Sequence, residues 1–368
     1  MIGLPPFYFG LMTLEFLLDY GLFLAKTLTI LVALLILMVV SVGMSHRGKQ
    51  TEKGHIEVRS VNDGMNQLTS NLKQVVLDPE VRKLETKSEK KQAKQEQKER
   101  KKEAKEGLDP KTRVFVVEFE GDVQASGVAG LREEITAILS VAAESDEVVL
   151  KLESPGGLVH SYGLAASQLQ RIVDRNVALT ISVDKVAASG GYMMACIGKK
   201  IIAAPFALLG SIGVVAQVPN FHRLLKSKEI DVEVLTAGEY KRTLTMFGEN
   251  TDKGREKFVE ELEDVHTLFK DFVADHRPQV NIDEVSTGEA WYGKRALERN
   301  LVDELVTSDE YIYDKCESCD VFVVKYVENQ NRVDKVLERF TAALARIRSP
   351  EELRQTAVAQ MNPERFKV

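Results

Sequence analysis

Between residues 114 and 235 the apolar residues alternate between strand-like and helix-like spacing, and this alternation constrains the fold more than any other feature. β-branched runs bounded by turn residues are typical of strands, and apolar residues three or four positions apart are typical of helices. The expected strands lie near Val114, Val148, Val177, Ile201, Val214 and Val232, and the expected helices near 129–143, 160–173 and Phe221. Strands that alternate with helices pair mainly in parallel through β-α crossovers. The sequence therefore predicts an α/β domain.

The stretch Val186–Ala195 places Ser189 where the β-branched run 177–183 gives way to a helix that we expect to begin near Gly190. At a helix N-terminus, backbone N–H groups and the helix dipole stabilise developing negative charge, which acyl transfer to a serine hydroxyl requires. Serine is also a common N-cap residue. This stretch alone therefore fits both a nucleophile and a structural helix cap.

Two further stretches add candidate site residues. Gly156 and Gly157 follow the expected strand near Val148, and glycines at such a turn let backbone N–H groups point into a cleft and form an oxyanion hole. An ordinary tight turn is the alternative for this stretch. Lys241 follows the expected strand at 232–236 and is flanked by residues typical of a loop.

These motifs occur in a fixed order: SPGG (154–157), ASGGYMMA (188–195), GSIGV (210–214), GEYK (238–241) and TGEAWYGKRALERNLVDEL (287–305). Together they resemble the signal peptide peptidase A family of membrane serine proteases, over nearly the whole chain. The resemblance implies a Clp protease-like, or crotonase-like, fold with a Ser-Lys dyad. It implies Ser189 as the nucleophile, Lys241 as the general base, and oxyanion N–H groups from Gly156 or Gly157 and from Gly190.

The histidines are consistent with a lysine base. A Ser-His-Asp protease needs a histidine near its nucleophile, but none of the six histidines lies in a stretch like the histidine-bearing segment of Clp-type proteases, where this chain has Ser211–Val214. A lysine base must be neutral, and lowering the pKa of a lysine from about 10.4 to about 7 costs about 4 kcal/mol, which only an apolar pocket supplies. Tyr240, Leu244 and Met246 are expected to form such a pocket around Lys241.

Charge and cysteine content exclude two classes of site. The net charge of −6 argues against a nucleic-acid surface. Cys196, Cys316 and Cys319 do not make a disulfide framework, and no second pair completes a tetrahedral metal site with Cys316 and Cys319. We expect the latter two to be an exposed pair able to oxidise locally. No metal and no organic cofactor is implied.

Residues 1–48 are expected to anchor the chain to a membrane. Residues 27–44 form an uncharged apolar run of about the 18 residues needed to cross a bilayer. Because no small-residue cleavage site marks a removed signal peptide, we expect the anchor to be retained. Residues 4–24 are also apolar but carry Glu15 and Asp19, so they fit a second, poorer span, an interfacial helix or an extension.

Two opposing signals bear on the side of the membrane that carries the remainder of the chain. His46, Arg47 and Lys49 follow the apolar run, and for a single span the positive-inside tendency would keep the C-terminal bulk cytoplasmic. The family resemblance instead favours the periplasmic face of a bacterial inner membrane. The periplasmic location is our expectation, and the cytoplasmic one stays open.

Residues 49–110 are expected to form a charged spacer. From residue 79 to residue 106 almost every residue is Lys, Arg, Glu or Gln, a composition that cannot bury a core and that forms a solvated helix or a disordered segment. Such a spacer would hold the globular domain away from the bilayer. A basic patch that binds anionic lipid is the alternative.

The peptidase domain is expected at residues 111–330. Near its end, 250–276 has the pattern of a long amphipathic helix whose apolar stripe fits a core or a subunit interface, and 321–327 that of a last strand. Residues 331–368 are expected to form a C-terminal helix, at 333–347, and a polar tail.

These features predict a membrane-anchored serine endopeptidase that acts through an acyl-enzyme. Its expected partners are peptide or protein substrates, the membrane, and further copies of itself, because half-length members of the family assemble into rings. Ser189 and Lys241 of one site can then come from neighbouring chains. Two alternatives stay open: a crotonase-like acyl-CoA enzyme, whose fold builds a similar oxyanion hole, and an inactive membrane scaffold of the same fold.

Overall fold

The computed structural model describes residues 19–31, 33, 54–106 and 111–329. The chain divides into two units, one formed by residues 54–328 and one by the terminal segments 1–53 and 329–368. In the terminal unit, residues 19–31 are helical.

Within the described ranges, none of the helices has the length and apolar character needed to cross a membrane. The predicted span at 27–44 and the poorer one at 4–24 fall mostly outside the described residues. The predicted C-terminal helix and tail at 331–368 lie wholly outside them.

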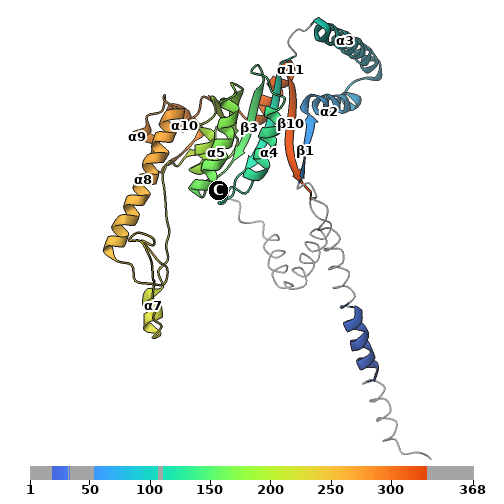
Figure 1. Cartoon of the computed structure of the whole chain (residues 1–368). Helices are drawn as coiled ribbons and strands as arrows, with labels where there is room; N and C mark the ends of the chain where they lie inside the picture. The colour runs from blue at the N-terminus through green and yellow to red at the C-terminus, as the bar shows by residue number, and fades with distance from the viewer. Residues whose placement is uncertain (1–18, 32, 34–53, 107–110, 330–368) are drawn as a thin grey trace, which may run out of the picture. The chain divides into compact units, whose positions relative to one another are not determined.

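A seven-stranded sheet forms the centre of the unit 54–328. From one edge to the other it runs β1 (Gly54–Ser60), β10 (Asp320–Glu328), β2 (Arg113–Glu120), β3 (Glu147–Glu153), β4 (Ala178–Val183), β6 (Lys200–Ala203) and β9 (Glu304–Leu305) (Figure 1). β1 is antiparallel to β10, and the other neighbouring strands are parallel. This arrangement confirms the predicted α/β class and the mainly parallel pairing.

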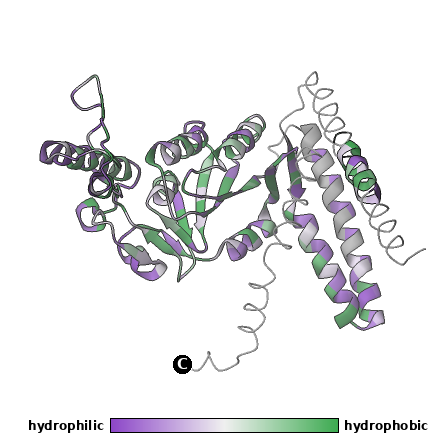
Figure 2. Ribbon diagram, turned by 90° about the horizontal axis from the view of Figure 1, so that it is seen from below, coloured by the Kyte–Doolittle hydropathy of each residue, from purple (hydrophilic) through white to green (hydrophobic). Residues whose placement is uncertain are grey.

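Helices α4 (Val128–Leu139) and α5 (Val159–Val173) cover one face of this sheet (Figure 1). Alternate side chains of the central strands, such as Val117, Leu150 and Ile181, are buried in the main core with the apolar sides of both helices. Figure 2 shows these central strands mostly in green, the colour of hydrophobic residues. Parallel strands need cover of this kind because most of their surface is apolar.

Helix α11 (Ser308–Ser318) contributes to a second, smaller cluster on the sheet, in which Ile312 is buried with Val116 and Val149. Cys319 belongs to this cluster and is only 9% exposed, and Cys316 packs against it. Both are free thiols. The predicted exposed pair is therefore wrong, because Cys319 is buried where the chain passes from α11 into β10, and Cys316 is half-buried.

The predicted spacer contains an integral strand of the domain. β1 adds a full-length edge strand to β10, and its last residue, Ser60, caps α2 (Val61–Val76) by accepting a hydrogen bond from the Asp63 N–H. Asn62 then joins α2 to the chain around β10 through three hydrogen bonds. The sheet therefore begins at residue 54, before the charged helix α3 (Pro79–Glu106), and not after it.

A second, three-stranded sheet carries the candidate nucleophile. It consists of β5 (Val186–Ala188), β7 (Leu208–Gly210) and β8 (Ala290–Tyr292). α6 (Gly190–Ala195) begins one residue after β5, and α10 (Gly293–Glu298) follows β8. The predicted helix start near Gly190 is thereby confirmed.

An arm leaves the second sheet after β7. It contains α7 (His222–Ser227) and α8 (Asp252–His276), which return to α9 (Ile282–Val285), and in Figure 1 α7 lies at the far end of the arm. The helix predicted at 250–276 is confirmed as α8. The strands predicted near Val214 and at 232–236 are absent among the described residues, where both stretches are irregular and belong to neither sheet.

Candidate active site

Ser189 occupies a sharp junction between β5 and α6. Its φ of 52° and ψ of −120° lie in a region that non-glycine residues rarely adopt. The backbone is held there because the Ser189 N–H donates to the Gly210 carbonyl oxygen at 2.8 Å. The side chain does not cap α6, and the hydroxyl forms no hydrogen bond with any described residue. The hydroxyl is therefore presented for contact rather than used to end the helix.

The SPGG turn brings Gly156 against this junction. Gly156 has a φ of +89°, and a Cβ atom there would lie 2.8 Å from the Cβ of Ser189 and 2.7 Å from the carbonyl oxygen of Ala188. A Cβ atom on Gly157 would collide with the carbonyl oxygen of Val123. Both positions therefore need glycine, for close approach and, at Gly156, for the positive φ.

Hydrogen bonding distinguishes the candidate oxyanion donors whose N–H groups are free from the one whose N–H group is already bonded. The Gly156 N–H donates to the Ser154 Oγ at 3.1 Å, and the Leu158 N–H donates to the Val123 carbonyl oxygen at 2.8 Å. Among the described residues, the N–H groups of Gly157 and Gly190 have no acceptor. An anion close to Ser189 can therefore be bound by these two groups, whereas the Gly156 N–H is already occupied.

A small cavity of about 90 Å³ opens beside the Ser189 hydroxyl. Its walls are mostly apolar and are formed by Gly157, Val159, Ser189, Gly190, Met193, Gly213, Val214, Val215, Val265 and Phe269. Phe269 belongs to α8, whose apolar stripe we expected to face a core or a subunit interface. Its helical spacing alone could not reveal that one end of the stripe borders the serine.

Lys241 is not among the residues that line this cavity. It lies exposed in a turn of the arm, where its N–H donates to the Gly238 carbonyl oxygen at 3.3 Å. The expected apolar pocket is not formed around it within one chain, since Tyr240 is 47% and Met246 42% exposed. The structure thus brings Gly156, Gly157 and Gly190 to Ser189 but leaves Lys241 apart from them.

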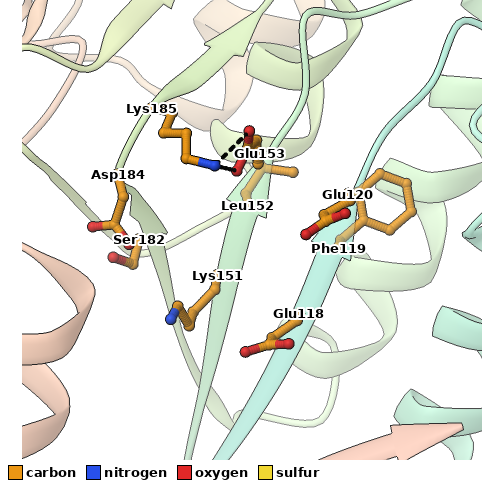
Figure 3. A pocket seen from close by; sticks show the side chains of 9 residues that line it. All are labelled: Glu118, Phe119, Glu120, Lys151, Leu152, Glu153, Ser182, Asp184 and Lys185. Carbon is orange, nitrogen blue, oxygen red and sulfur yellow. Dashed lines mark hydrogen bonds and ion pairs between the residues drawn. The ribbon is translucent and has the colours of Figure 1, made fainter. Parts of the chain in front are cut away.

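A second cavity, of about 210 Å³, lies over the polar side of the strands β2, β3 and β4 (Figure 3). It contains Ser182 and two lysines, but Ser182 is 1% exposed and its hydroxyl is not accessible. Lys185 is paired with Glu153 at 2.8 Å, and Lys151 lies 3.8 Å from Asp309. This cavity therefore lacks an accessible serine hydroxyl, and each of its two lysines lies beside a carboxylate.

Comparison with known proteins assigns the family. Residues 15–169 match the family described as peptidase family S49 N-terminal, and residues 171–321 match peptidase family S49. The chain belongs to peptidase family S49. It is therefore a serine peptidase, as the order of its motifs predicts, and family S49 membership decides against the acyl-CoA enzyme.

Curated relatives of this chain are named as proteases. This chain is 51% identical over 326 residues to the probable protease SohB of Haemophilus influenzae, and the match covers 87% of this chain and 92% of that protein. It is 46% identical over 303 residues to the probable protease SohB of Buchnera aphidicola subsp. Schlechtendalia chinensis, covering 81% of this chain and 99% of that protein.

A solved structure also overlaps with this chain. It is a mutant of the 1510-N membrane-bound stomatin-specific protease in complex with a substrate peptide, with 14% identity and a TM-score of 0.40 over 64% of this chain and 100% of that one. An overlap this loose supports no inference about the site of this chain.

Proposed function

We propose that this S49 peptidase is a membrane-anchored endopeptidase in which Ser189 attacks a peptide carbonyl and Lys241 accepts the hydroxyl proton. The observation that carries the proposal is the free Ser189 hydroxyl at a strained junction, beside a cavity that is also lined by Gly157 and Gly190, whose N–H groups are unpaired. Strained backbone and preorganised donors of this kind are typical of acyl-transfer sites.

The reaction then proceeds in two steps. The Ser189 Oγ bonds to the substrate carbonyl carbon, the C–N bond breaks, and the proton taken up by Lys241 passes to the leaving amine. Water then gives up a proton to Lys241 and attacks the acyl-enzyme, which releases the second product and restores the Ser189 hydroxyl. The developing oxyanion is bound by Gly157 and Gly190 rather than by Gly156, whose N–H already donates to Ser154.

Lys241 reaches the serine of a neighbouring subunit in this proposal. The arm that carries it has large apolar side chains that one chain leaves exposed: Phe221, Leu224, Val234, Leu235, Tyr240, Met246 and Phe247. A homo-oligomeric ring would cover them and would surround Lys241 with the apolar environment that a neutral lysine requires. The site would then be complete only between subunits.

The cavity beside Ser189 favours an apolar residue before the scissile bond. A volume of about 90 Å³ with apolar walls fits a small or medium hydrophobic side chain and excludes a charged one. The proposed substrates are peptides or membrane-proximal proteins that contain such residues. The proposed location is the bacterial inner membrane, with the peptidase domain on the periplasmic face and the cytoplasmic face as the alternative.

The first experiment tests the dyad in the full-length chain. Wild type is compared with Ser189→Ala and Lys241→Ala for release of peptides from an unfolded protein and for labelling by a fluorophosphonate. We expect both variants to lose at least about 10³-fold in rate, and labelling to disappear, because the acyl-enzyme needs both groups.

Matched controls are available for both positions. Ser182→Ala removes a buried hydroxyl outside the site, and Lys226→Ala removes an exposed lysine from the same arm. Both controls should retain wild-type activity. Equal activity of all five proteins would refute the dyad, and an unlabelled, inactive but folded wild type would favour the scaffold.

A further inference from the structure

A buried chain of hydrogen bonds begins at the SPGG turn. The Ser154 Oγ accepts from the Gly156 N–H at 3.1 Å and lies 2.6 Å from the Tyr162 hydroxyl, which donates to the Asp122 carbonyl oxygen at 2.7 Å. A carbonyl oxygen can only accept, so the single Tyr162 proton points to Asp122. The Ser154 proton must then point to Tyr162, which leaves the Ser154 oxygen as an acceptor for Gly156. Only one arrangement of protons satisfies the chain.

Hydrogen bonds hold the peptide groups on both sides of the Gly156–Gly157 peptide, and this chain of bonds supplies one of them. The Gly156 N–H is held by Ser154, and the Leu158 N–H is held by Val123. Each peptide group is planar and turns as a unit, so holding the groups on both sides restricts the directions in which the Gly157 N–H between them can point. That N–H is the one in the turn that remains free beside Ser189.

Tyr162 also contacts the other oxyanion donor. A Cβ atom on Gly190 would lie 2.5 Å from the Cγ of Tyr162, so the ring packs directly against the first residue of α6. The Ser154 backbone is joined to β5 as well, through bonds of 2.8 Å to the Val186 carbonyl oxygen and 3.0 Å from the Ala188 N–H. The two side chains therefore touch both halves of the site while remaining fully buried.

We propose that Ser154 and Tyr162 are positioning residues, which hold the N–H groups of Gly157 and Gly190 at the spacing that the oxyanion needs. The proposal rests on the function proposed above. Neither side chain lines the cavity beside Ser189, so they act through the two glycines and not on the substrate. Burial raises the pKa of the Tyr162 hydroxyl, which keeps it a proton donor throughout the working pH range.

The test uses full-length enzyme and a fluorogenic peptide with an apolar residue before the scissile bond. Tyr162→Phe removes the hydroxyl and leaves the ring against Gly190, and Ser154→Ala removes the acceptor of the Gly156 N–H. We expect kcat to fall about tenfold or more in each variant with KM within about twofold, because the donors act mainly in the transition state. Because the pair acts as one unit, kcat of the double variant should be no lower than kcat of the less active single variant.

Inhibitor binding separates positioning from a general loss of structure. A peptide aldehyde forms a hemiacetal whose oxygen needs the oxyanion donors, whereas the matching peptide alcohol does not. Affinity for the aldehyde should fall in parallel with kcat/KM, and affinity for the alcohol should stay within about twofold. Unchanged aldehyde affinity in both variants, or equal losses for both ligands, would overturn the proposal.

Tyr192→Phe is the matched control for Tyr162→Phe. Tyr192 is also fully buried, and its hydroxyl donates at 2.9 Å to the Leu301 carbonyl oxygen, outside the site. It should lower the melting temperature about as much while kcat stays at the wild-type value; an equal loss of kcat would overturn the proposal. Ser189→Ala is measured alongside: if it remains active, the proposed function fails, and if it is inactive while Tyr162→Phe equals wild type, only the positioning role fails.

Discussion

At the scale of single residues, the site depends on backbone conformations that the surrounding structure must maintain. The positive φ values of Ser189 and Gly156 place a hydroxyl and an oxyanion turn in contact. A non-glycine residue in such a region costs about 1–3 kcal/mol, so the junction persists only because its neighbours hold it. The Ser189 N–H bond to Gly210 and the pairing of Ala188 with Gly210 provide that support.

Arg277 and Asp303 form a second residue-scale feature, at the base of the arm. Arg277 follows α8 and has a side chain only 2% exposed, and it donates to both Asp303 carboxylate oxygens at 2.8 and 2.9 Å. Asp303 also accepts from the Ile201 N–H at 2.7 Å and so joins the arm to β6. Burial alone would raise the pKa of Asp303, but the bonds from Arg277 and Ile201 lower it below its usual range.

We expect Asp303→Asn to destabilise the protein by about 2–3 kcal/mol at pH 7, because the buried Arg277 loses its counter-charge. The lowered pKa means that the ionised carboxylate contributes stability above its unfolded pKa of about 3.9 and loses it as the pH falls through the folded value. The difference from wild type, measured by urea denaturation, should therefore shrink below about pH 4.

Asp309→Asn is the control for this measurement. Asp309 is 93% exposed and lies 3.8 Å from Lys151, so its loss should change stability by less than about 0.5 kcal/mol at any pH. A difference between Asp303→Asn and wild type that stays constant down to pH 2 would contradict the role assigned to the ionised carboxylate.

At the scale of elements, the charged helix α3 is an insertion between two strands of the domain. β1 and β2 both belong to the main sheet, on either side of β10, although α2 and α3 separate them in the chain. The segment before Gly54 therefore enters the domain directly through β1. The charged stretch therefore interrupts the sequence of the domain, whereas we expected it to precede the domain.

Replacing Pro79–Glu106 by a short flexible linker should therefore leave the domain folded, with a free energy of unfolding within about 1 kcal/mol of wild type. Asn62→Ala, in contrast, should cost about 2 kcal/mol, since it removes partners from the carbonyl oxygens of Cys316 and Cys319 and from the Val321 N–H. Circular dichroism during thermal unfolding measures both. Unfolding of the shortened chain, with Asn62→Ala unaffected, would show that α3 and not the start of α2 supports the sheet.

At the scale of the whole molecule, one chain brings together the proposed nucleophile and the proposed oxyanion donors but leaves Lys241, the proposed base, exposed in the arm. The arm also exposes apolar side chains that water solvates poorly, with Leu235 90% exposed. Burial of apolar surface is the main favourable term in subunit association. Both features have one explanation if the arm of each subunit covers the site of the next.

Co-expression of Ser189→Ala and Lys241→Ala chains tests this arrangement. If each site takes its serine from one chain and its lysine from a neighbour, random mixed assembly restores about a quarter of wild-type activity, although each variant alone is inactive. If both residues of a site come from one chain, mixing restores nothing. Peptide release per mole of chain, with assembly checked by size-exclusion chromatography, distinguishes the two.

The local sequence determined most of the elements and the family of this protein. Helical spacing and β-branched runs predicted α4, α5, α8 and the central strands, because these patterns report which side of an element faces the core. The ordered motifs predicted the serine peptidase family. The strands expected near Val214 and at 232–236 were wrong, because a strand also needs a partner that its own residues do not specify.

The tertiary structure alone decided which groups are free to act. Gly156 and Gly157 are the same residue type in one turn, but the Ser154 Oγ accepts from the Gly156 N–H, while the Gly157 N–H stays unpaired. The Ser154 hydroxyl is itself held by Tyr162, which donates to the distant Asp122 carbonyl oxygen. The same holds for β1, whose place in the sheet depends on pairing with β10 at the other end of the domain. Hydrogen-bond partners and strand neighbours are long-range contacts, and the periodicity of a short stretch carries no information about them.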